Sequence, residues 1–340
     1  MLAIDVTTYG WTTALKTGVV LAVIPAAAIV LGYTFLLKMM SHMQSRLGPM
    51  EAGPHGVLQL LADGVKFIQK EDIIPDEADR RIFALAPLVV ILSTFLLYIV
   101  LPAGPRLIVQ DLDVGIFFAL AVSSLSVIGV LMAGWSSANK YSLLGALRAA
   151  GQLIAYELPL VLAVIGVVVQ AGTMSMQGIV AAQAHGEIFG VGTFGNPFIL
   201  TQFVGFFLFL VAAQAELTQT PFDMPVAESE LVAGYMTEYS GFRFLFFFMA
   251  EFGTAFALAA IAATLFLGGW FVPGVHGTAA DVLGPLVLGA KIMVVAFLIF
   301  WIRFTYPRFR EDQLQTFAWK YLIPLSLVNI VVTGVLKVVL

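Results

Sequence analysis

The chain of 340 residues contains no cysteine, and only 11% of its residues are charged. Without cysteine it cannot form disulfides, thiolate-bound iron–sulfur clusters or a catalytic thiol. We therefore expect no cofactor that is bound covalently or by metal ligation. Soluble domains carry charge on roughly a quarter of their residues, so the low charge, together with 60% hydrophobic residues, excludes a water-soluble domain. The net charge of −4 is too small to indicate a nucleic-acid partner.

Long runs without charged residues dominate the sequence instead. A membrane core of about 30 Å needs about 20 apolar residues per helix. We predict eight membrane-spanning helices from the runs at 17–37, 82–105, 114–139, 158–186, 188–215, 252–280, 282–302 and 321–336, the seventh broken only by Lys291. Glycine and serine within the fourth and fifth runs place those two helices near 153–171 and 198–215. The predicted fold class is an all-α integral membrane protein with a single membrane domain over residues 1–340.

The basic residues indicate an orientation for these helices. Thirteen of the 17 lysines and arginines lie in or beside the loops after the first, third, fifth and seventh helices. The positive-inside rule therefore makes these loops cytoplasmic and places both termini outside. The first apolar run follows a single base, Lys16, which is not the pattern of a cleaved signal peptide. The cytoplasmic loops extend over about residues 41–82, 136–152, 214–242 and 304–316.

The first cytoplasmic loop contains an amphipathic segment at about residues 56–70. Its apolar residues recur at near-helical spacing: Val57, Leu60, Leu61, Val65, Phe67 and Ile68. Polar side chains, among them Asp63 and Lys66, lie between them. We expect an amphipathic helix at the membrane surface. This helix either caps the helix bundle or forms a surface through which lipid or quinone gains access.

The segment after the fifth predicted helix is strongly anionic. Residues 216–241 contain five acids, namely Glu216, Asp223, Glu228, Glu230 and Glu238. Apolar side chains such as Phe222 alternate with them, which favours a buried loop over a solvated acidic loop. A single base, Arg243, follows directly. A buried carboxyl group without a partner has a raised pKa and can exchange protons near neutral pH.

Four ionisable residues lie within the predicted helices. Glu157, Glu216 and Glu251 fall in the cytoplasmic third of the membrane, and Lys291 lies nearer the outer side. Such residues are costly in a membrane and usually serve a function. Carboxylates at similar depth suit a proton-conducting or proton-coupled pathway. The alternative is that each one pairs with a base or a backbone group to fix helix packing, and this applies most to Lys291.

Five groups of residues, in order along the chain, carry a resemblance to a known family. They are Gln44–Pro49; Gly56–Gln59 with Ala62-Asp63 and Lys70-Glu71; Gly134–Tyr141 with Gly145–Arg148; Pro221-Phe222-Asp223 to Tyr239-Ser240; and Trp301-Ile302-Arg303 through Pro307–Leu314 to Trp319-Lys320. In these motifs the chain resembles the H subunit of bacterial respiratory complex I, the proton-pumping NADH:quinone oxidoreductase. The resemblance covers essentially the whole sequence.

The resemblance implies a subunit at the joint between the hydrophilic arm and the membrane arm of the complex. Such a subunit forms much of the access path for its substrate, ubiquinone or menaquinone. The first helix, the amphipathic helix with Asp63, and the sixth helix would line this path, with Arg46 and Phe222 in neighbouring loops. We add Lys66 and Arg243 as candidate residues of the quinone path.

The resemblance also implies where protons and charge move. Carboxylates that match Glu157, Glu216, Glu228, Glu230 and Glu251 belong to the family's proton and charge pathway, and we include Lys291 as a candidate. The implied partners are the quinone-site and terminal-cluster subunits of the hydrophilic arm, the small subunits of the membrane arm, quinone and lipid. The implied location is the bacterial plasma (inner) membrane.

Four positions depart from the usual family pattern. Leu36 and Leu37 stand where an acid and an arginine are usual, Gln219 stands in place of an arginine, and Val226 in place of a glutamate. Two acids and two bases are lost together, so the local charge is nearly unchanged. We hypothesise that protons here depend more heavily on Glu216, Glu228 and Glu230.

Other assignments remain open at this point. The equivalent subunit of a membrane-bound hydrogenase, or of a relative with another electron donor, would share these motifs, and the neighbouring genes would distinguish it. A stand-alone proton-coupled transporter also uses buried carboxylates, but transporters often have two similar halves, and residues 1–170 and 171–340 show no repeat. A purely structural scaffold would keep its turnover after the intramembrane glutamates were neutralised.

Overall fold

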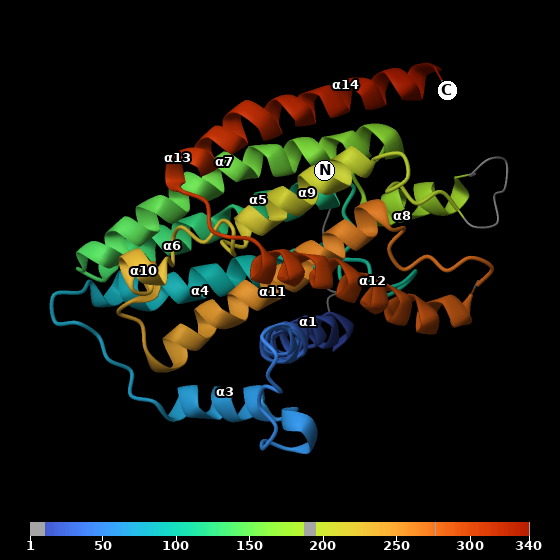
Figure 1. Cartoon of the computed structure of the whole chain (residues 1–340). Helices are drawn as coiled ribbons and strands as arrows, with labels where there is room; N and C mark the ends of the chain where they lie inside the picture. Colours follow the sequence, from blue (N-terminus) through green and yellow to red (C-terminus); the bar gives the residue numbers. More distant parts are fainter. Residues whose placement is uncertain (1–10, 187–194, 276, 340) are drawn as a thin grey trace.

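The computed structural model describes residues 11–186, 195–275 and 277–339. These residues form helices joined by loops and contain no strand (Figure 1). The predicted all-α fold class is therefore confirmed. In Figure 1, α14 and α7 lie side by side at the top, α4 and α11 lie below them, and α1 and α3 are at the bottom.

Within the described ranges, seven helical segments are long and apolar enough to cross a membrane. The first is α1 (Trp11–Leu31), which continues through the π-helical η2 (Gly32–Met39) into α2 (Met40–Met43). The others are α4 (Arg80–Leu97) with η4 (Tyr98–Val100), α5 (Gly115–Ser123) with α6 (Leu125–Ser136), α7 (Lys140–Ala171), α11 (Gly241–Phe266), α12 (Thr278–Thr305), and α13 (Glu311–Phe317) with η7 (Ala318–Leu322) and α14 (Ile323–Val339).

The fifth predicted span is shorter than expected. It corresponds to α9 (Phe203–Glu216), whose 14 residues extend over about 21 Å, less than the thickness of a membrane core. Helices α7, α11 and α14 pack around it. Gln202, directly before α9, donates to Thr333 Oγ1 at 2.6 Å and accepts from Asn329 Nδ2 at 3.0 Å. Irregular backbone is tolerated at membrane depth where protein surrounds it in this way.

The start of the fourth predicted span, near residue 153, is wrong. Helix α7 already begins at Lys140, so most of the predicted loop 136–152 is helical. Asn139 caps the helix, because its side chain accepts a hydrogen bond from the backbone N–H of Tyr141 at 2.8 Å. Gly134 of α6 allows close packing, since a Cβ atom there would lie 2.2 Å from Ala146 Cβ. Lys140 and Arg148 suggested a loop, whereas both belong to the first turns of this long helix.

The predicted segment 56–70 contains helix α3 (Gln59–Gln69). The helix begins three residues late because η3 (Pro54–Gly56) forms a tight turn with positive φ at His55 and Gly56. None of the α3 side chains is buried. Figure 1 shows α3 below α1, at the edge of the helix bundle. Leu61, Val65 and Ile68 are at least half exposed on it.

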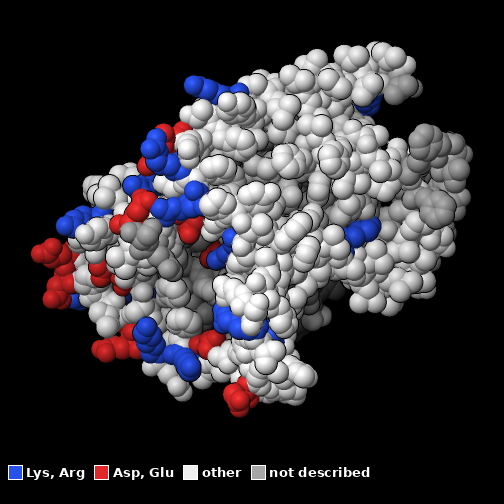
Figure 2. All heavy atoms as spheres, viewed as in Figure 1, with Lys and Arg blue, Asp and Glu red and all other residues white. Residues whose placement is uncertain are grey.

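Charged side chains gather at one end of the bundle in the face shown by Figure 2. This end includes the short helix α10 (Glu228–Leu231) and the predicted cytoplasmic loops. The loops contact one another there: Asp79 N–H donates to Ser136 O at 3.1 Å, and Glu230 pairs with Arg148 and Arg308. The opposite end of this face is mostly uncharged.

Candidate functional site

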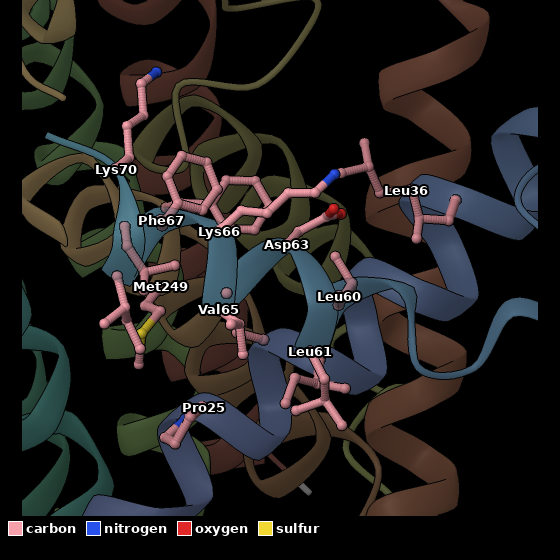
Figure 3. Close-up of a pocket in the computed structure, with 17 residues that line it drawn as sticks. Pro25, Leu36, Leu60, Leu61, Asp63, Val65, Lys66, Phe67, Lys70 and Met249 are labelled. Atoms are coloured by element: carbon pink, nitrogen blue, oxygen red, sulfur yellow. The ribbon is translucent and has the colours of Figure 1, made fainter. Parts of the chain in front are cut away.

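A cavity of about 670 Å³ lies between the first helix, α3 and α11. Its walls are mostly apolar. Among the described residues, its only charged lining residues are Asp63 and Lys66 of α3 and Lys70, which directly follows α3. Figure 3 shows the ends of Asp63 and Lys66 on one side of α3 near Leu36, while Lys70 points away. The remaining lining residues come from α1 (Pro25, Ala28, Ile29), η2 (Leu36, Leu37), α3 (Leu60, Leu61, Gly64, Val65, Phe67, Ile68) and α11 (Leu245, Phe248, Met249).

The segment before α3 is attached to the π-helical part of the first helix. Tyr33 Oη donates to His55 O at 3.0 Å, and Lys38 Nζ donates to Pro49 O at 2.8 Å. Gly32 faces Leu60, so a Cβ atom at residue 32 would lie only 2.8 Å from Leu60 Cδ1. The glycine therefore lets α3 approach the first helix closely at this end of the cavity.

The other end of α3 is attached to the beginning of α11. Phe67 stacks on Phe244 with ring centroids 5.5 Å apart, and Arg243 pairs with Asp72 at 3.2 Å. Ser240 Oγ donates to Glu71 O at 3.1 Å. Both ends of α3 are thus attached to the bundle, while none of its side chains is buried, so the helix lies across the outer side of the cavity.

The structure brings only two of the five predicted quinone-path residues, Asp63 and Lys66, into the cavity lining. Arg46 lies in the turn after α2, where its Nε donates to Gln44 Oε1 at 2.8 Å. Arg243 pairs with Asp72, and its guanidinium lies 5.5 Å from the Phe83 ring centre. Arg243 thus supports one end of α3 without lining the cavity.

Phe222, the fifth predicted quinone-path residue, lies in the core. It is 3% exposed and packs edge-on against Tyr156 at 5.2 Å between ring centroids, and against Phe309 at 5.6 Å. It therefore anchors the loop after α9 to α7 and to the loop after α12. By contrast, Leu36 and Leu37, which replace charged residues of the family pattern, do line the cavity.

The loop between α9 and α11 packs tightly against the bundle. Gly234 has a φ of +55°, and a Cβ atom there would lie 1.8 Å from Pro225 O, so only glycine fits. Tyr239 stacks on Phe83 at 4.0 Å between ring centroids, and its hydroxyl donates to Phe83 O at 3.1 Å. Burial raises the pKa of Tyr239 to about 12, so the hydroxyl stays neutral as a donor. The prediction of a buried loop agrees with this packing.

Glu251 of α11 is held by two donors. Arg303 Nη1 of α12 and Gln219 Nε2 of the loop after α9 both lie 3.1 Å from Glu251 Oε1. Gln219, the residue that replaces an arginine of the family pattern, is thus in direct contact with a predicted pathway carboxylate. Arg303 balances the charge of Glu251.

Glu216 ends α9, and its carboxylate is close enough to that of Glu157 in α7 for the two charges to interact. Among the side chains that the structure describes, none forms a hydrogen bond with the buried Oε2 atom of Glu216. Gln152 Nε2 donates to Ala215 O at 2.8 Å and so ties α7 to this end of α9. Glu157 follows Arg148 by nine residues, which is about 14 Å along α7. The two predicted carboxylates are therefore neighbours below the charged end of the bundle.

Glu230 belongs to an ion cluster at the charged end. It pairs with Arg148 of α7 at 2.6 Å and with Arg308 of the loop after α12, and Arg148 also lies 3.5 Å from Glu311 of α13. Hydrogen bonding from Arg148, together with the charges of both arginines, holds the pKa of the Glu230 carboxyl below its usual range. Glu230 therefore stays ionised at neutral pH. The side chain of Glu228, also a predicted pathway residue, lies outside the described residues.

We expect Glu230→Gln to loosen the contact between α10 and the loop at residues 306–310. The side chain of Glu230 is 42% exposed, so solvent screens the cluster and its contribution is at most about 1 kcal/mol. Amide hydrogen exchange of both segments should accelerate by about fivefold at neutral pH. Because the folded pKa of Glu230 is lowered, the contribution is complete above the unfolded value of about 4.3 and disappears as the pH falls through the folded value. Unchanged exchange at neutral pH would contradict this role.

Lys291 of α12 is bonded to backbone. Its Nζ lies 2.7 Å from Gly269 O and 3.4 Å from Phe271 O, both in the segment after α11. It also borders a smaller cavity of about 240 Å³. These bonds match the alternative in which Lys291 fixes helix packing.

Comparison with known proteins identifies the family of this chain. The sequence profile of the family described as NADH dehydrogenase matches residues 15–334. The chain belongs to this family. The H subunit of the NADH-quinone oxidoreductase of Dehalococcoides mccartyi strain CBDB1 is 48% identical over 297 residues, which cover 87% of this chain and 79% of that protein. The corresponding proteins of Geobacillus kaustophilus (46%) and Brevibacillus brevis (44%) match over 321 residues each, or 94% and 93% of this chain and 92% of each relative.

Membership in the NADH dehydrogenase family confirms the predicted function at the level of the complex. The chain is a multi-pass membrane subunit of an NADH:quinone oxidoreductase, complex I, and its partners are other subunits of that complex. This identity decides against a stand-alone transporter and favours complex I over a hydrogenase.

The sequence interpretation did not single out the arginines that pair with the carboxylates, namely Arg148, Arg303 and Arg308. All three lie in the motifs that carried the family resemblance. Arginine in an apolar sequence was the available signal, because a guanidinium near a membrane helix needs an acidic partner.

Proposed function

We propose that the cavity between α1, η2, α3 and α11 is the passage through which quinone reaches the complex. The observation that carries the proposal is the cavity itself, with apolar walls from three helices and with charged side chains, among the described residues, only from α3 and the residue after it. An isoprenoid quinone has a long apolar tail and a polar ring, and binding sites for such molecules combine apolar walls with a few polar groups. Since α3 lies at the edge of the bundle with exposed apolar side chains, the passage can admit molecules from the lipid.

We further propose that Glu157, Glu216 and Glu251 link quinone reduction to proton transfer. Glu216 has a buried oxygen that finds no hydrogen-bond partner in the described ranges, and Glu157 is its neighbour. Because the charge of Glu157 acts on Glu216, the two carboxyl groups do not gain or lose a proton independently. Glu230 is better suited to a fixed anion that holds α7, α10 and the loop after α12 together, since two arginines bind it. For Glu228, the proposed role in the pathway rests on the family resemblance alone.

The same arrangement supports an orientation in the membrane. We propose that the charged end of the bundle faces the cytoplasm and carries the hydrophilic arm of the complex, in a bacterial plasma membrane. The ion cluster around Glu230 and the unevenly distributed basic residues support this orientation.

A photoreactive quinone analogue bound to the purified complex tests the passage. We expect cross-links within residues 59–70 and 245–249, which line the cavity from two helices, and we expect added natural quinone to reduce them. Exposed residues of α14, such as Val331 and Val335, serve as a control for labelling from the lipid. Labelling of α14 equal to that of α3, or labelling that natural quinone does not reduce, would contradict the proposal.

A further inference from the structure

Gln219 is a buried amide with one satisfied end and one unsatisfied end. Its Nε2 donates to Glu251 Oε1 at 3.1 Å. Its Oε1 is buried, and no donor from the described part of the chain reaches it. The residue is 1% exposed. A buried acceptor without a donor is costly, so its retention beside an ionisable group needs an explanation.

The chemistry of the pair supplies one explanation. An ionised carboxylate only accepts hydrogen bonds, a protonated carboxyl group also donates one, and an amide can do both. While Glu251 is ionised, Gln219 donates to it through Nε2. Once Glu251 is protonated, its O–H group can donate to Gln219 Oε1 after the amide rotates by half a turn. Arg303, the other partner of Glu251, has donors alone, so it can bond the oxygens of either form but cannot accept from the O–H group of the protonated form.

The surroundings connect this rotation to the loop after α9. Gln219 N–H bonds to Gln214 O at 3.4 Å, and Phe222 N–H bonds to Gln219 O at 2.8 Å, so the residue is part of the turn that leaves α9. Among the described residues, Arg303 of α12 pairs with Glu251, and the charges of Glu251 and of Asp223 in the loop both act on Tyr235, also in the loop. Gln219 is thus the neutral contact between Glu251 and the loop that also carries Phe222.

We propose that Gln219 is a positioning residue that supports both protonation states of Glu251 and transmits the change between them to the loop after α9. The proton is gained and lost by Glu251 alone. The amide exchanges its N–H···O bond to the carboxylate for an O–H···O bond from the carboxyl group. This inference rests on the proposed function, in which Glu251 exchanges a proton during turnover.

The test uses the assembled complex and three substitutions. Gln219→Arg leaves donors only, and Gln219→Met keeps the length of the side chain without hydrogen bonding. Gln214→Met is the matched control, because Gln214 is also a buried glutamine with an unpaired Oε1 among the described residues, but its Nε2 donates to the backbone oxygen of Thr220 at 2.8 Å. Proton pumping per electron and the infrared signal of the protonated Glu251 carboxyl are measured. The signal is assigned by its loss in Glu251→Gln.

We expect Gln219→Arg to abolish the infrared signal of protonated Glu251 and to lower pumping by roughly tenfold or more. In the family pattern an arginine here is accompanied by a glutamate at the position of Val226, whereas in this chain the new arginine would pair with Glu251 and hold it ionised. Gln219→Met should shift the signal, since the carboxyl group loses its amide partner, and should also reduce pumping. Gln214→Met should leave the signal unchanged. If Gln219→Arg does not assemble, the signal in Gln219→Met decides between the two outcomes.

Two results separate the inference from the proposed function. If Glu251→Gln pumps normally, the role of Glu251 in proton transfer is wrong whatever Gln219 does. If Glu251→Gln stops pumping while both Gln219 variants keep the normal signal and pumping, the inference is overturned and the proposed function stands. An equal effect of Gln214→Met and Gln219→Met would also overturn the inference, because it would show a structural role alone.

Discussion

Gly64→Phe is expected to lower kcat/KM for quinone by about tenfold or more, mainly through a higher KM. Gly64 lines the cavity, and a Cβ atom added there would meet no other atom within 4 Å. A side chain can therefore begin at residue 64 without a clash at its Cβ atom, and a phenyl ring there would narrow the passage. Glycine is also the poorest helix former after proline, so the substitution does not weaken α3. The loss should arise from blocked access for quinone.

Gly334→Phe in α14 is the matched control for this substitution. A Cβ atom at residue 334 likewise meets nothing within 4 Å, and the residue does not border the cavity. Quinone reduction is measured in membranes that contain the assembled complex, alongside NADH oxidation by a water-soluble acceptor. The acceptor rate should stay unchanged in both variants. Normal quinone kinetics in assembled Gly64→Phe would rule out this cavity as the passage.

Glu216→Gln is expected to reduce proton pumping by about a hundredfold while the complex still assembles. Loss of a proton-transferring group typically costs a factor of about 10² to 10⁴. Glutamine has nearly the same shape as glutamate, so the packing at the end of α9 is preserved. It removes the carboxyl group that we propose exchanges the proton and on which the charge of Glu157 acts.

Glu77→Gln controls for the loss of one negative charge at the same end of the bundle. Glu77 is exposed in the loop before α4. Pumping per electron in vesicles should be unchanged in this variant. Should Glu216→Gln pump as well as Glu77→Gln, protons would not pass through Glu216.

Helix identity could be predicted from sequence wherever an apolar run was long and uninterrupted. The helices α4, α11, α12 and α14 overlap their predicted ranges for this reason. The start of α7 could not be predicted in the same way, because Asn139 and Gly134 act through a cap and a close helix contact, and neither affects hydropathy. The short length of α9 depends on the packing of neighbouring helices, which a window of residues does not contain.

The sequence predicted candidate residues of the site, but not which residues they contact. Buried acids in apolar sequence identify Glu157, Glu216 and Glu251 as unusual. Glu216 has a buried oxygen without a hydrogen-bond partner among the described residues, whereas Glu230 is bound by two arginines. Those arginines lie 78 or more residues from Glu230 in the sequence, so the sequence does not reveal the difference. The same holds for Gln219, whose contact with Glu251 turns a departure from the family pattern into a feature of the site.

Composition and the long apolar runs alone determined that this chain is a helical membrane protein, because the cost of burying charge in lipid and the length of a membrane helix are local properties. Its family was indicated by the resemblance of its motifs. The tertiary structure decided which side chains share a cavity and which carboxylates have partners. It placed Asp63 and Lys66 at the cavity, Phe222 in the core, and Arg303 and Gln219 on Glu251. Electrostatic environment depends on distances between segments remote in sequence, and only the packed helices set those distances.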